Sequence, residues 1–386
     1  MNFSMTEDQQ AFAELAEQFA AKSLAPYAAE WDANGYFPKE MFKQAGELGF
    51  MGLYTNPDFG GLGLPRLDAA IIFEKLAYGD TSATAFMTIH NMVAWMIGEF
   101  AKREVAEKYV PDMITGEKLG SYCLTEPNAG SDAASLKTKA VKNGDHYLLT
   151  GQKMFISGAG ATDVLVVMAR TADNGAKGIS AFIVDANAEG VSYGKNEHKM
   201  GWKNQPTAAV HFSNVKVPVE NLLGEEGQGF TFAMKGLDGG RINIGTCAIG
   251  TAQAALDRAV QYVGERSQFG KTLNQFQSVQ FKLADMLTEL VAARQMVRLA
   301  AYHLDNGSPD ATTYCAMAKR LATDISFEVA NQALQLHGGY GYLQEYPLER
   351  HVRDLRVHQI LEGTNEVMRM ITARNMMEDG ALARLQ

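Results

Sequence analysis

The sequence predicts a multidomain α+β fold in which a helical domain, an antiparallel β-barrel or sandwich, and a helical bundle follow one another. Apolar residues recur at helical spacing in the first third of the chain. Short β-rich runs separated by Gly, Asn and Asp come next, and long helical patterns return in the last third. A length of 386 residues also suits more than one domain. We expect domains at 1–117, 118–225 and 226–386.

The first third carries clear helix-start and helix-break signals. Thr6 and Gln9 have the spacing of a capping box. Pro26 is expected to kink or restart the first helix, and Pro38 suits the first turn of the next one. Residues 58–66 are expected to form a loop, because four of these nine residues are Gly or Pro.

Further elements follow from the same patterns. Helices are expected at about 67–78 and 82–100, and Pro111 is expected to open a short last one. The β-rich runs are 146–151, 163–170, 180–186 and 208–217. The long helices of the last third are expected near 229–264, 276–305, 310–337 and 361–378, lengths that fit an up-down bundle.

The composition argues against several classes of function. Hydrophobic residues make up 46% and charged residues 20% of the chain, which is typical of a globular protein. A net charge of −9 without a basic run argues against nucleic acid binding. The histidines and cysteines lack metal-ligand spacing, so no metal is expected.

The same composition sets the expected compartment. Cys123, Cys247 and Cys315 lie far apart, as is typical of a reducing environment. The longest uncharged apolar stretch, 81–98, contains several polar residues and is expected to be a buried helix, so no membrane insertion is expected. The first ten residues are polar and acidic, unlike a signal or transit peptide, and we expect a cytoplasmic protein.

The first informative motif is YCLTEPNAGSD, residues 122–132. A strand end runs into a Pro-Asn-Ala-Gly turn that offers the hydroxyls of Thr125 and Ser131 and free backbone N–H groups. Such a loop can satisfy the polar edge of a flat ring and cradle a phosphate-bearing ligand. On composition alone, an ordinary β-turn with Ser131 and Asp132 as caps is the simpler explanation.

The second motif is HGGYGY, residues 337–342. Its glycines let the backbone approach a ligand closely, and Gln335 can donate to a phosphate. On composition alone, a helix C-cap followed by a tight turn explains it more simply.

The third motif is LEGTNE, residues 361–366. An apolar neighbour such as Leu361 desolvates the Glu362 carboxyl, and desolvation raises a carboxyl pKa. A base that abstracts a weakly acidic C–H proton needs such a raised pKa. In isolation, a solvated or helix-capping Glu is the simpler explanation.

Five segments in order along the chain resemble the acyl-CoA dehydrogenase family. They are CLTEPNAGSD (123–132), GQKMFISGAG (151–160), ERSQFGK (265–271), LQLHGGYGY (334–342) and ILEGTNEVMR (360–369). The resemblance covers nearly the whole chain and several segments are family signatures. It implies an N-terminal helical domain, a middle β-domain and a C-terminal four-helix-bundle domain, as the patterns above predict independently.

The resemblance implies FAD as the cofactor. Thr125 is then expected on the pyrimidine side of the flavin, Ser157 near N5, and Arg266 on the pyrophosphate of a neighbouring subunit. Because relatives build this site across a subunit boundary, a homotetramer arranged as a dimer of dimers is implied. The expected FAD contacts are Tyr122, Leu124, Thr125, Gly130, Ser131, Phe155, Ile156, Ser157, Arg266, Phe276, Gln277, Gln335, Leu336, His337, Gly338, Gly339, Thr364, Asn365 and Glu366.

The resemblance also implies an acyl-CoA substrate and a catalytic role for Glu362. This residue is expected to remove the α-proton while a hydride leaves the β-carbon for the flavin, which passes electrons to an electron-transfer flavoprotein. Some branched-chain relatives carry the base near 238–239, where this chain offers glycine instead of Glu. The expected substrate contacts are Ser131, Asp238, Gly239, Gly240, Arg241, Gly363 and Arg374.

Longer stretches resemble the isobutyryl-CoA dehydrogenase branch of the family, and they are 155–171, 200–212, 235–247 and 351–369. This resemblance implies conversion of isobutyryl-CoA to methacrylyl-CoA, a step of valine catabolism. The alternatives are a short-chain or 2-methylbutyryl-CoA dehydrogenase and a flavin oxidase of the same fold. A non-enzymatic acyl-CoA-binding scaffold is disfavoured by the intact motifs.

The helix expected at 82–100 is the candidate floor of the acyl pocket. No Lys or Arg lies between Lys75 and Lys102 to pair with a dicarboxylic substrate. Ordinary core packing is the alternative for most of the bulky candidates, which are Phe86, Met87, His90, Met92 and Trp95.

Overall fold

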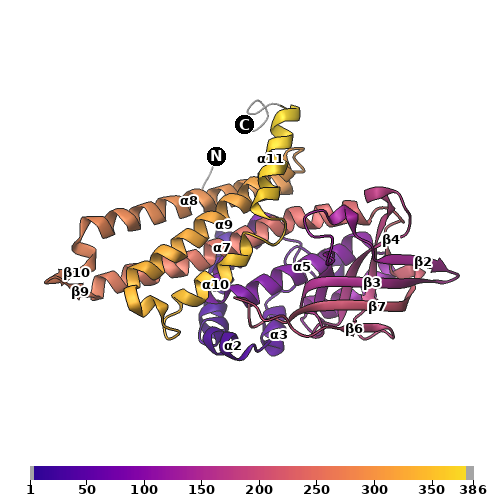
Figure 1. The fold of residues 1–386 in the computed structure, drawn as a ribbon, viewed down its shortest axis with the longest axis horizontal. Coiled ribbons are helices and arrows are strands. Elements are labelled where there is room, and N and C mark those ends of the chain that lie inside the picture. Colours follow the sequence, from indigo (N-terminus) through magenta and orange to yellow (C-terminus); the bar gives the residue numbers. More distant parts are fainter. Residues whose placement is uncertain (1–3, 380–386) are drawn as a thin grey trace.

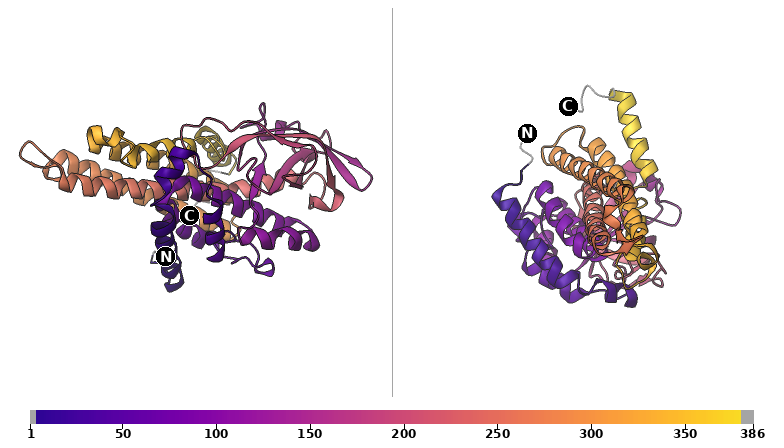
Figure 2. Two further views of the ribbon diagram at one scale, coloured as in Figure 1. Left: turned by 90° about the horizontal axis from the view of Figure 1, so that it is seen from below. Right: turned by 90° about the vertical axis from the view of Figure 1, so that its left-hand side faces the viewer.

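The computed structural model describes residues 4–379 and has the predicted order of helices, strands and helices. Figure 1 shows the sheet at one end of the molecule and the tips of the long C-terminal helices at the other. Figure 2 shows that the N-terminal helices lie along one side of these long helices.

The N-terminal part contains six α-helices, and the predicted capping box is confirmed. Gln9 donates its backbone N–H to Thr6 Oγ1 at 3.2 Å. A π-helical turn at Ala20–Leu24 ends the first helix just before Pro26. The α-helices are α1 (Glu7–Phe19), α2 (Ala28–Asn34), α3 (Lys39–Glu47), α4 (Arg66–Gly79), α5 (Thr81–Phe100) and α6 (Arg103–Ile114).

The prediction that Pro111 opens the last of these helices is wrong. Pro111 lies inside α6, which begins at Arg103. The helix buries Val105, Tyr109 and Met113 along one face, and this packing outweighs the backbone hydrogen bond that proline cannot donate.

The middle part is one eight-stranded sheet with the order β6-β7-β3-β2-β4-β5-β8, and β1 pairs with β4. Most pairs are antiparallel as predicted, but β1 and β2 both run parallel to β4. The intervening β2–β3 hairpin supplies the long connection that a parallel pair needs. The strands are β1 (Gly120–Cys123), β2 (Lys139–Asn143), β3 (His146–Ser157), β4 (Val164–Arg170), β5 (Ile179–Asp185), β6 (Val191–Tyr193), β7 (Thr207–Pro218) and β8 (Leu222–Leu223).

The C-terminal part contains one more helix than the sequence patterns predict. Its elements are α7 (Gly229–Glu265), the hairpin β9 (Ser267–Gln268) and β10 (Lys271–Thr272), α8 (Gln277–Asp305), α9 (Ala311–His337), α10 (Leu348–His358) and α11 (Asn365–Asp379). The unpredicted helix α10 is highly charged but buries Leu348, Asp354 and Leu355. The last helix starts later than predicted, because Glu362 and Gly363 adopt positive φ angles of 56° and 90°.

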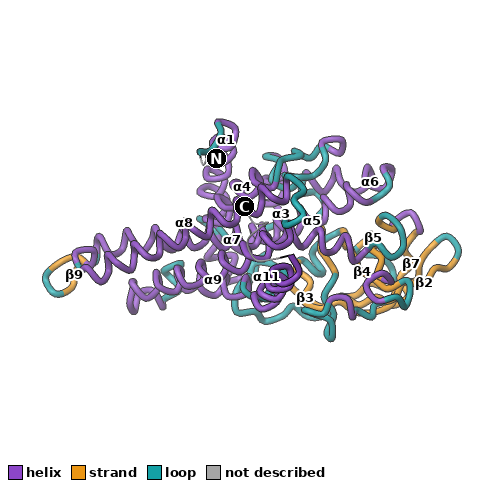
Figure 3. The backbone as a smooth tube through the Cα atoms, turned by 90° about the horizontal axis from the view of Figure 1, so that it is seen from above, coloured by secondary structure: helices purple, strands orange, loops and turns teal. Residues whose placement is uncertain are grey.

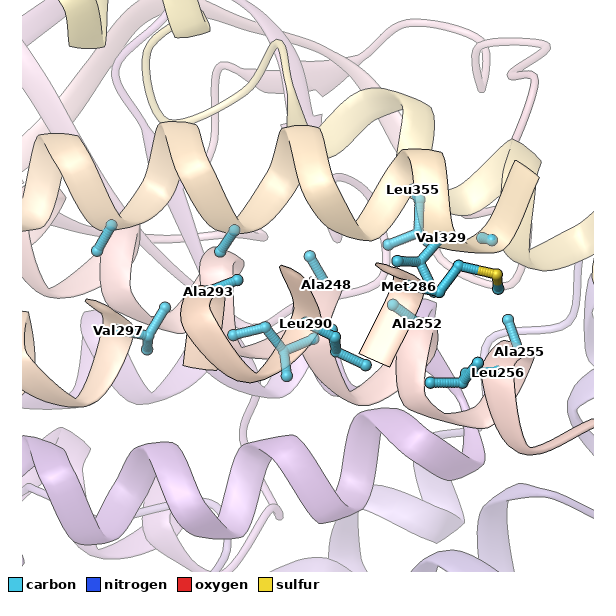
Figure 4. Close-up of a cluster of buried hydrophobic side chains, with 14 of the residues drawn as sticks. Ala248, Ala252, Ala255, Leu256, Met286, Leu290, Ala293, Val297, Val329 and Leu355 are labelled. Atoms are coloured by element: carbon cyan, nitrogen blue, oxygen red, sulfur yellow. The ribbon is translucent and has the colours of Figure 1, made fainter. Parts of the chain in front are cut away.

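Small side chains let the long helices pack closely. Figure 4 shows Ala248 and Ala252 of α7 facing Leu290 and Ala293 of α8, with Val329 of α9 completing the contact. Alanine at these contacts allows the helix backbones to approach each other, and interdigitated apolar side chains exclude voids. The resulting rigid bundle holds the loop between α10 and α11.

Helices α5 and α7 connect the bundle to the sheet. Met92 and Val93 of α5 and Phe232 of α7 share one apolar core with Val164 and Val166 of the sheet. Figure 3 shows both helices running from the bundle to the strands. Elements from all three parts of the chain therefore meet at this junction.

The described residues offer neither a membrane-spanning helix nor a metal-binding cluster. Among the helices within residues 4–379, none has the length and apolarity needed to cross a membrane. The same residues contain no group of three or more His, Cys, Asp or Glu arranged to hold a metal ion.

Candidate active site

A cavity of about 450 Å³ lies at the junction of the sheet, α5, α7 and α11. The structure brings together here residues of the first and third sequence motifs, three residues of the segment 151–160 and two arginines. The predicted site residues that line it are Tyr122, Leu124, Thr125, Gly130, Ser131, Phe155, Ile156, Ser157, Arg241, Glu362, Gly363 and Arg374.

Glu362 is held in a constrained loop between α10 and α11. Its φ of 56° lies in the left-handed region, which a non-glycine residue adopts only when its surroundings enforce it. Its Oε2 atom is buried and has no hydrogen-bond partner among the described residues. A Cβ atom at Gly240 of α7 would overlap this oxygen, so glycine leaves room for the carboxyl group.

Burial raises the pKa of Glu362 to about 7, from an ordinary value of 4.5. The positive charges of Arg241 and Lys319 oppose this rise because they stabilise the carboxylate. A carboxylate with such a pKa is a stronger base than an exposed Glu and still ionises near neutral pH.

Arg241 supplies a buried positive charge on the α7 side of the cavity. Its Nη1 donates to Asp238 Oδ1 at 2.6 Å, and Thr312 donates to the other carboxylate oxygen of Asp238 at 2.7 Å. The Nε atom of Arg241 is buried and lacks a partner among the described residues. Arg374 of α11 is exposed at the mouth of the cavity, where its charge can meet an anionic part of a ligand.

The wall opposite α7 is formed by the predicted strand-turn motif and the end of β3. The Tyr122 hydroxyl is buried without a partner among the described residues, and a Cβ at Gly130 would meet open space. Phe155 has a φ of 57° and is 60% exposed, so its backbone and ring turn out of the strand. Next to it, Ser157 adds a hydroxyl to the lining.

A buried ion pair holds this wall in place. Lys153 is completely buried and donates to Glu126 Oε1 at 2.8 Å and to the Leu124 carbonyl at 3.0 Å. Glu126 also accepts backbone N–H groups from Lys137 and Thr138 at 2.6 and 2.9 Å. Leu124 and Glu126 of the motif are thus tied to β3 and to the residues just before β2.

The apolar floor differs from the sequence expectation. Of the five bulky candidates on α5, only Met92 lines the cavity. Phe86 belongs to the apolar cluster of the N-terminal helices, Trp95 packs between that cluster and the core at the junction, and Met87 and His90 are fully buried. The apolar side chains that do line the cavity include Ile89, Met92, Phe230, Met234 and Leu237.

Another group of predicted FAD contacts lines a second cavity of about 430 Å³. It lies where α9 ends, and its predicted members are Arg266, Gln335, Leu336, His337, Gly338 and Gly339. His337 follows Lys319 by 18 positions along α9, which corresponds to about 27 Å at the rise of an α-helix. One chain therefore does not bring the two groups together.

Several predicted contacts line neither cavity, and these are Phe276, Gln277, Thr364, Asn365, Glu366, Asp238, Gly239 and Gly240. Asn365 is 3% exposed, and its side chain is engaged with Lys319, Thr323 and Asp324 of α9. Gly239 and Gly240 instead make room for the side chains of Arg66 and Glu362.

Besides the apolar floor, sequence reasoning missed Trp202 and Lys319. Trp202 lines the cavity with a φ of 53°, and its backbone N–H donates to Asp354 at 2.6 Å. Lys319 lies behind Glu362 and is completely buried. The sequence did offer a signal for Lys319, because this lysine stands among the alanines 316, 318 and 322 of an apolar helix face. Buried lysines are rare unless they have partners.

Comparison with known proteins identifies the family. The chain matches the N-terminal domain of acyl-CoA dehydrogenases over residues 6–117, the middle domain over 121–215 and the C-terminal domain over 227–377. It is 52% identical over 376 residues to a mitochondrial isobutyryl-CoA dehydrogenase of Dictyostelium discoideum, covering 97% of this chain and 90% of the relative. The corresponding enzyme of Bos taurus is 51% identical over 378 residues, with 98% and 91% covered.

Solved structures agree with this assignment. Butyryl-CoA dehydrogenase from Megasphaera elsdenii superimposes with a TM-score of 0.95 at 43% identity, over 98% of this chain and all of that one. A chain from a study of the electron transferring flavoprotein of Acidaminococcus fermentans gives 0.96 at 41% identity, over 98% and 100%. A complex of PigA with FAD and proline gives 0.95 at 29% identity, over 98% and 99%.

The residues at the junction fit a bound flavin. The buried, unpartnered Tyr122 hydroxyl and the open space at Gly130 lie beside the half-exposed Phe155, so the wall offers both polar groups and a flat surface. The second cavity offers the Arg266 guanidinium and open space at Gly338 and Gly339, as a phosphate-bearing ligand requires. The chain belongs to the acyl-CoA dehydrogenase family and is an FAD-dependent oxidoreductase that acts on acyl-CoA.

Proposed function

We propose that the enzyme converts isobutyryl-CoA to methacrylyl-CoA and that Glu362 removes the α-proton of the substrate. One observation carries the catalytic assignment. The Glu362 carboxyl is enclosed in a cavity lined by both the flavin-fitting wall and an apolar floor, and burial raises its pKa to about 7. The two isobutyryl-CoA dehydrogenases that match this chain at 52% and 51% identity support the choice of substrate.

The chain's own groups account for proton removal. The Glu362 carboxylate takes the α-proton, and its buried position keeps competing water away from the base. The backbone N–H of Glu362, which has no acceptor among the described residues, can donate to the thioester oxygen and stabilise the developing enolate. FAD, when bound, accepts the hydride from the β-carbon.

The apolar floor supports a short acyl chain. Ile89 and Met92 of α5 and Leu237 of α7 line the cavity together with Trp202, which packs against His358 of α10. One methylene in an apolar pocket changes binding by only about 1–3 kcal/mol, so n-butyryl-CoA and 2-methylbutyryl-CoA are expected as secondary substrates. Ser131 and Arg374 are proposed to contact the CoA portion, and Arg241 the polar atoms near the reacting carbon.

The separation of the two cavities supports a shared site in an oligomer. His337, which lines the second cavity together with Arg266 and Gln335, lies about 27 Å along α9 from Lys319, too far to complete the flavin site in the same chain. We therefore propose that they contact the adenosine and phosphate portion of FAD in a neighbouring subunit of a homotetramer. Phe276, Gln277 and residues 364–366 retain their proposed FAD roles through the same association.

The electron acceptor, the compartment and the domain boundaries complete the proposal. An electron-transfer flavoprotein is the proposed acceptor, supported by the structural neighbour from a study of such a protein. Three free, buried cysteines support a reducing compartment, for which we propose the cytoplasm. The changes from helix to strand and back support boundaries at 117/118 and 225/226.

Anaerobic flavin reduction tests the substrate assignment. The holoenzyme is mixed with isobutyryl-, 2-methylbutyryl-, n-butyryl-, isovaleryl- or octanoyl-CoA, and the loss of flavin absorbance is followed. Isobutyryl-CoA is expected to reduce the flavin with the largest ratio of reduction rate constant to dissociation constant. A larger value for n-butyryl- or octanoyl-CoA would overturn the assignment.

A flavin oxidase is the competing function, because a prolyl acyl carrier protein oxidase also shares the fold at 29% identity. Oxygen consumption during turnover distinguishes the two functions. A dehydrogenase is expected to need an added flavoprotein or dye acceptor, whereas an oxidase would turn over with oxygen alone.

A further inference from the structure

Lys319 of α9 is a buried cation that no step of the proposed reaction uses. Its side chain is completely buried, and Nζ donates to the Gly363 carbonyl at 2.8 Å and to Asn365 Oδ1 at 2.9 Å. Among residues 4–379 it makes no direct ion pair with a carboxylate. Because burying an ammonium group is costly without strong partners, its location calls for a physical reason.

The two acceptors lie in the loop that carries Glu362. Gly363 directly follows Glu362 and has a φ of 90°, so the Lys319 hydrogen bond fixes the peptide group next to the candidate base. Asn365 ends the loop, and its backbone N–H donates to the Gln359 carbonyl at 3.0 Å. Lys319 therefore holds the loop from Gln359 to Asn365 against α9.

Neighbouring residues of α9 complete this attachment. Asp324 accepts from the side chains of Gln359 and Asn365 at 2.9 and 2.7 Å, and Thr323 accepts from Asn365 at 2.9 Å. These contacts hold the ends of the loop, but they come from residues one turn of α9 beyond Lys319 and do not reach Gly363. The only α9 side chain that reaches the peptide beside Glu362, among the described residues, is Lys319.

Lys319 and Glu362 also interact through their charges. Burial lowers the pKa of Lys319 to about 7, and the Glu362 carboxylate is the strongest influence that raises it again. In return, Lys319 lowers the pKa of Glu362. Other titratable or charged groups face this pair, and they are Arg241 of α7, Asp324 of α9, Glu366 of α11, His358 of α10, Tyr54 and Tyr122.

We propose that Lys319 is a positioning residue for Glu362, which ties the strained loop to α9 and places a buried positive charge behind the carboxylate. This inference rests on the proposed role of Glu362 as the base. Lys319 does not line the cavity, so it acts through Glu362 and not by touching the substrate.

The test compares Lys319→Met with Thr323→Val in the holoenzyme. The first change removes the charge and the donor to Gly363. The second removes a neutral group of the same network, one helical turn away and equally buried. Both kcat and KM for isobutyryl-CoA are measured from pH 5.5 to 9, a range chosen to bracket the pKa of about 7.

Lys319→Met is expected to lower kcat on the order of tenfold with little change in KM, because the base is misplaced while the pocket is intact. The midpoint of the acidic limb of kcat is expected to rise by about one pH unit, because a positive charge no longer stabilises the carboxylate. Thr323→Val is expected to keep the wild-type midpoint. A wild-type midpoint in Lys319→Met would overturn the proposal.

An infrared difference titration of the Glu362 carboxyl gives a readout that needs no turnover. The band is assigned by its absence in Glu362→Gln, and its midpoint is expected to rise in Lys319→Met. If Lys319→Met does not fold, Lys319→Gln retains an amide donor and removes only the charge, and the same rise is expected. Should Glu362→Gln keep wild-type turnover, the proposed function fails, whereas an unshifted carboxyl band would refute the Lys319 inference by itself.

Discussion

Gly240 of α7 and Glu362 of the α10–α11 loop oppose each other so closely that a Cβ atom at position 240 would overlap Glu362 Oε2. The glycine lies inside a 37-residue helix, where it costs about 1 kcal/mol relative to alanine. A helix accepts this cost at Gly240 because a neighbouring group needs the space that a side chain would fill. Here the carboxyl of the proposed base occupies that space.

Gly240→Ala is expected to lower kcat by about 100-fold, because the added methyl group displaces the carboxyl from its position. The melting temperature is expected to stay equal or rise, since alanine favours the helix. Gly264→Ala in the same helix is the control, because a Cβ there meets only Asn274 at 3.7 Å. Unchanged kinetics in Gly240→Ala would mean that Glu362 works from another position.

Glu362→Gln is expected to reduce turnover by several orders of magnitude and to leave FAD and acyl-CoA binding largely intact. The amide has nearly the same shape as the carboxyl but cannot accept the α-proton. Stopped-flow flavin reduction measures the chemical step, and equilibrium titration with substrate measures binding. The exposed Glu345 offers a matched Glu→Gln control that should behave as wild type. Substantial flavin reduction by the Glu362 variant would remove this residue from the mechanism.

The pH dependence of activity should follow the carboxyl of Glu362. Its pKa in the folded protein is raised to about 7, and only the carboxylate can act as a base. We therefore expect kcat/KM to be constant above pH 8 and to fall about tenfold per unit below the pKa of about 7. A midpoint near the ordinary value of 4.5 would show that the carboxyl is solvated.

The same raised pKa makes the folded protein less stable as pH rises, whereas it makes the enzyme more active. Between 4.5 and about 7 the folded chain binds more protons at Glu362 than the unfolded chain does. The free energy of unfolding therefore falls as pH rises through this window. Glu362→Gln should remove this loss and stabilise the protein by about 1–3 kcal/mol at pH 8, but not at pH 4.5. Urea titrations of both proteins at equal protein and FAD concentrations provide the comparison.

Local sequence patterns were sufficient to predict most helices and strands but not how these elements pair and pack. The Thr6–Gln9 capping box and the α5 and α7 periodicities depend on neighbours within a few residues, so the sequence predicts them. The parallel pairing of β1 with β4 depends on long-range contacts, and no local signal marks it.

Burial explains why the sequence predicted the wrong residues for the pocket floor and missed Lys319. Phe86 and Met92 lie on the same helix and are similarly apolar, yet only Met92 reaches the cavity, because the N-terminal helices cover the other face of α5. The role of Lys319 likewise depends on a contact with Gly363, 44 residues later in the chain. The family resemblance identified Glu362 as the candidate base, but only the folded chain shows which residues hold its carboxyl in place.

Arg266→Ala is expected to weaken FAD retention. Arg266 and the Gly338–Gly339 turn line the second cavity, where a guanidinium can bind phosphate with two hydrogen bonds. FAD occupancy after dilution and gel filtration, read from absorbance, should fall at least several-fold. Arg258→Ala, an exposed arginine two turns earlier in α7, should retain FAD. Equal occupancy in both variants would argue against a flavin phosphate at this cavity.

Lys153→Met should destabilise the protein and disturb the flavin wall together. Lys153 and Glu126 form a buried pair at 2.8 Å, and removing the cation leaves the Glu126 carboxylate buried with only backbone donors from Lys137 and Thr138. Breaking such a pair costs about 3–5 kcal/mol. Urea unfolding should show this loss, and FAD occupancy should fall because the segment from Tyr122 to Ser131 keeps its backbone bond from Met154 to Thr125 but loses its side-chain attachment to β3.

A double-mutant cycle distinguishes the stability lost with the Lys153–Glu126 ion pair from the stability lost with side-chain packing. Lys153→Met with Glu126→Gln removes both charges, so the double variant should recover about half of the stability lost in Lys153→Met. Lys142→Met, on the exposed side of β2, should change stability by less than about 0.5 kcal/mol. If the double variant were as unstable as the sum of the two single ones, the ion pair would not be what holds the wall, and the hydrogen bond from Lys153 to the Leu124 carbonyl would carry that role instead.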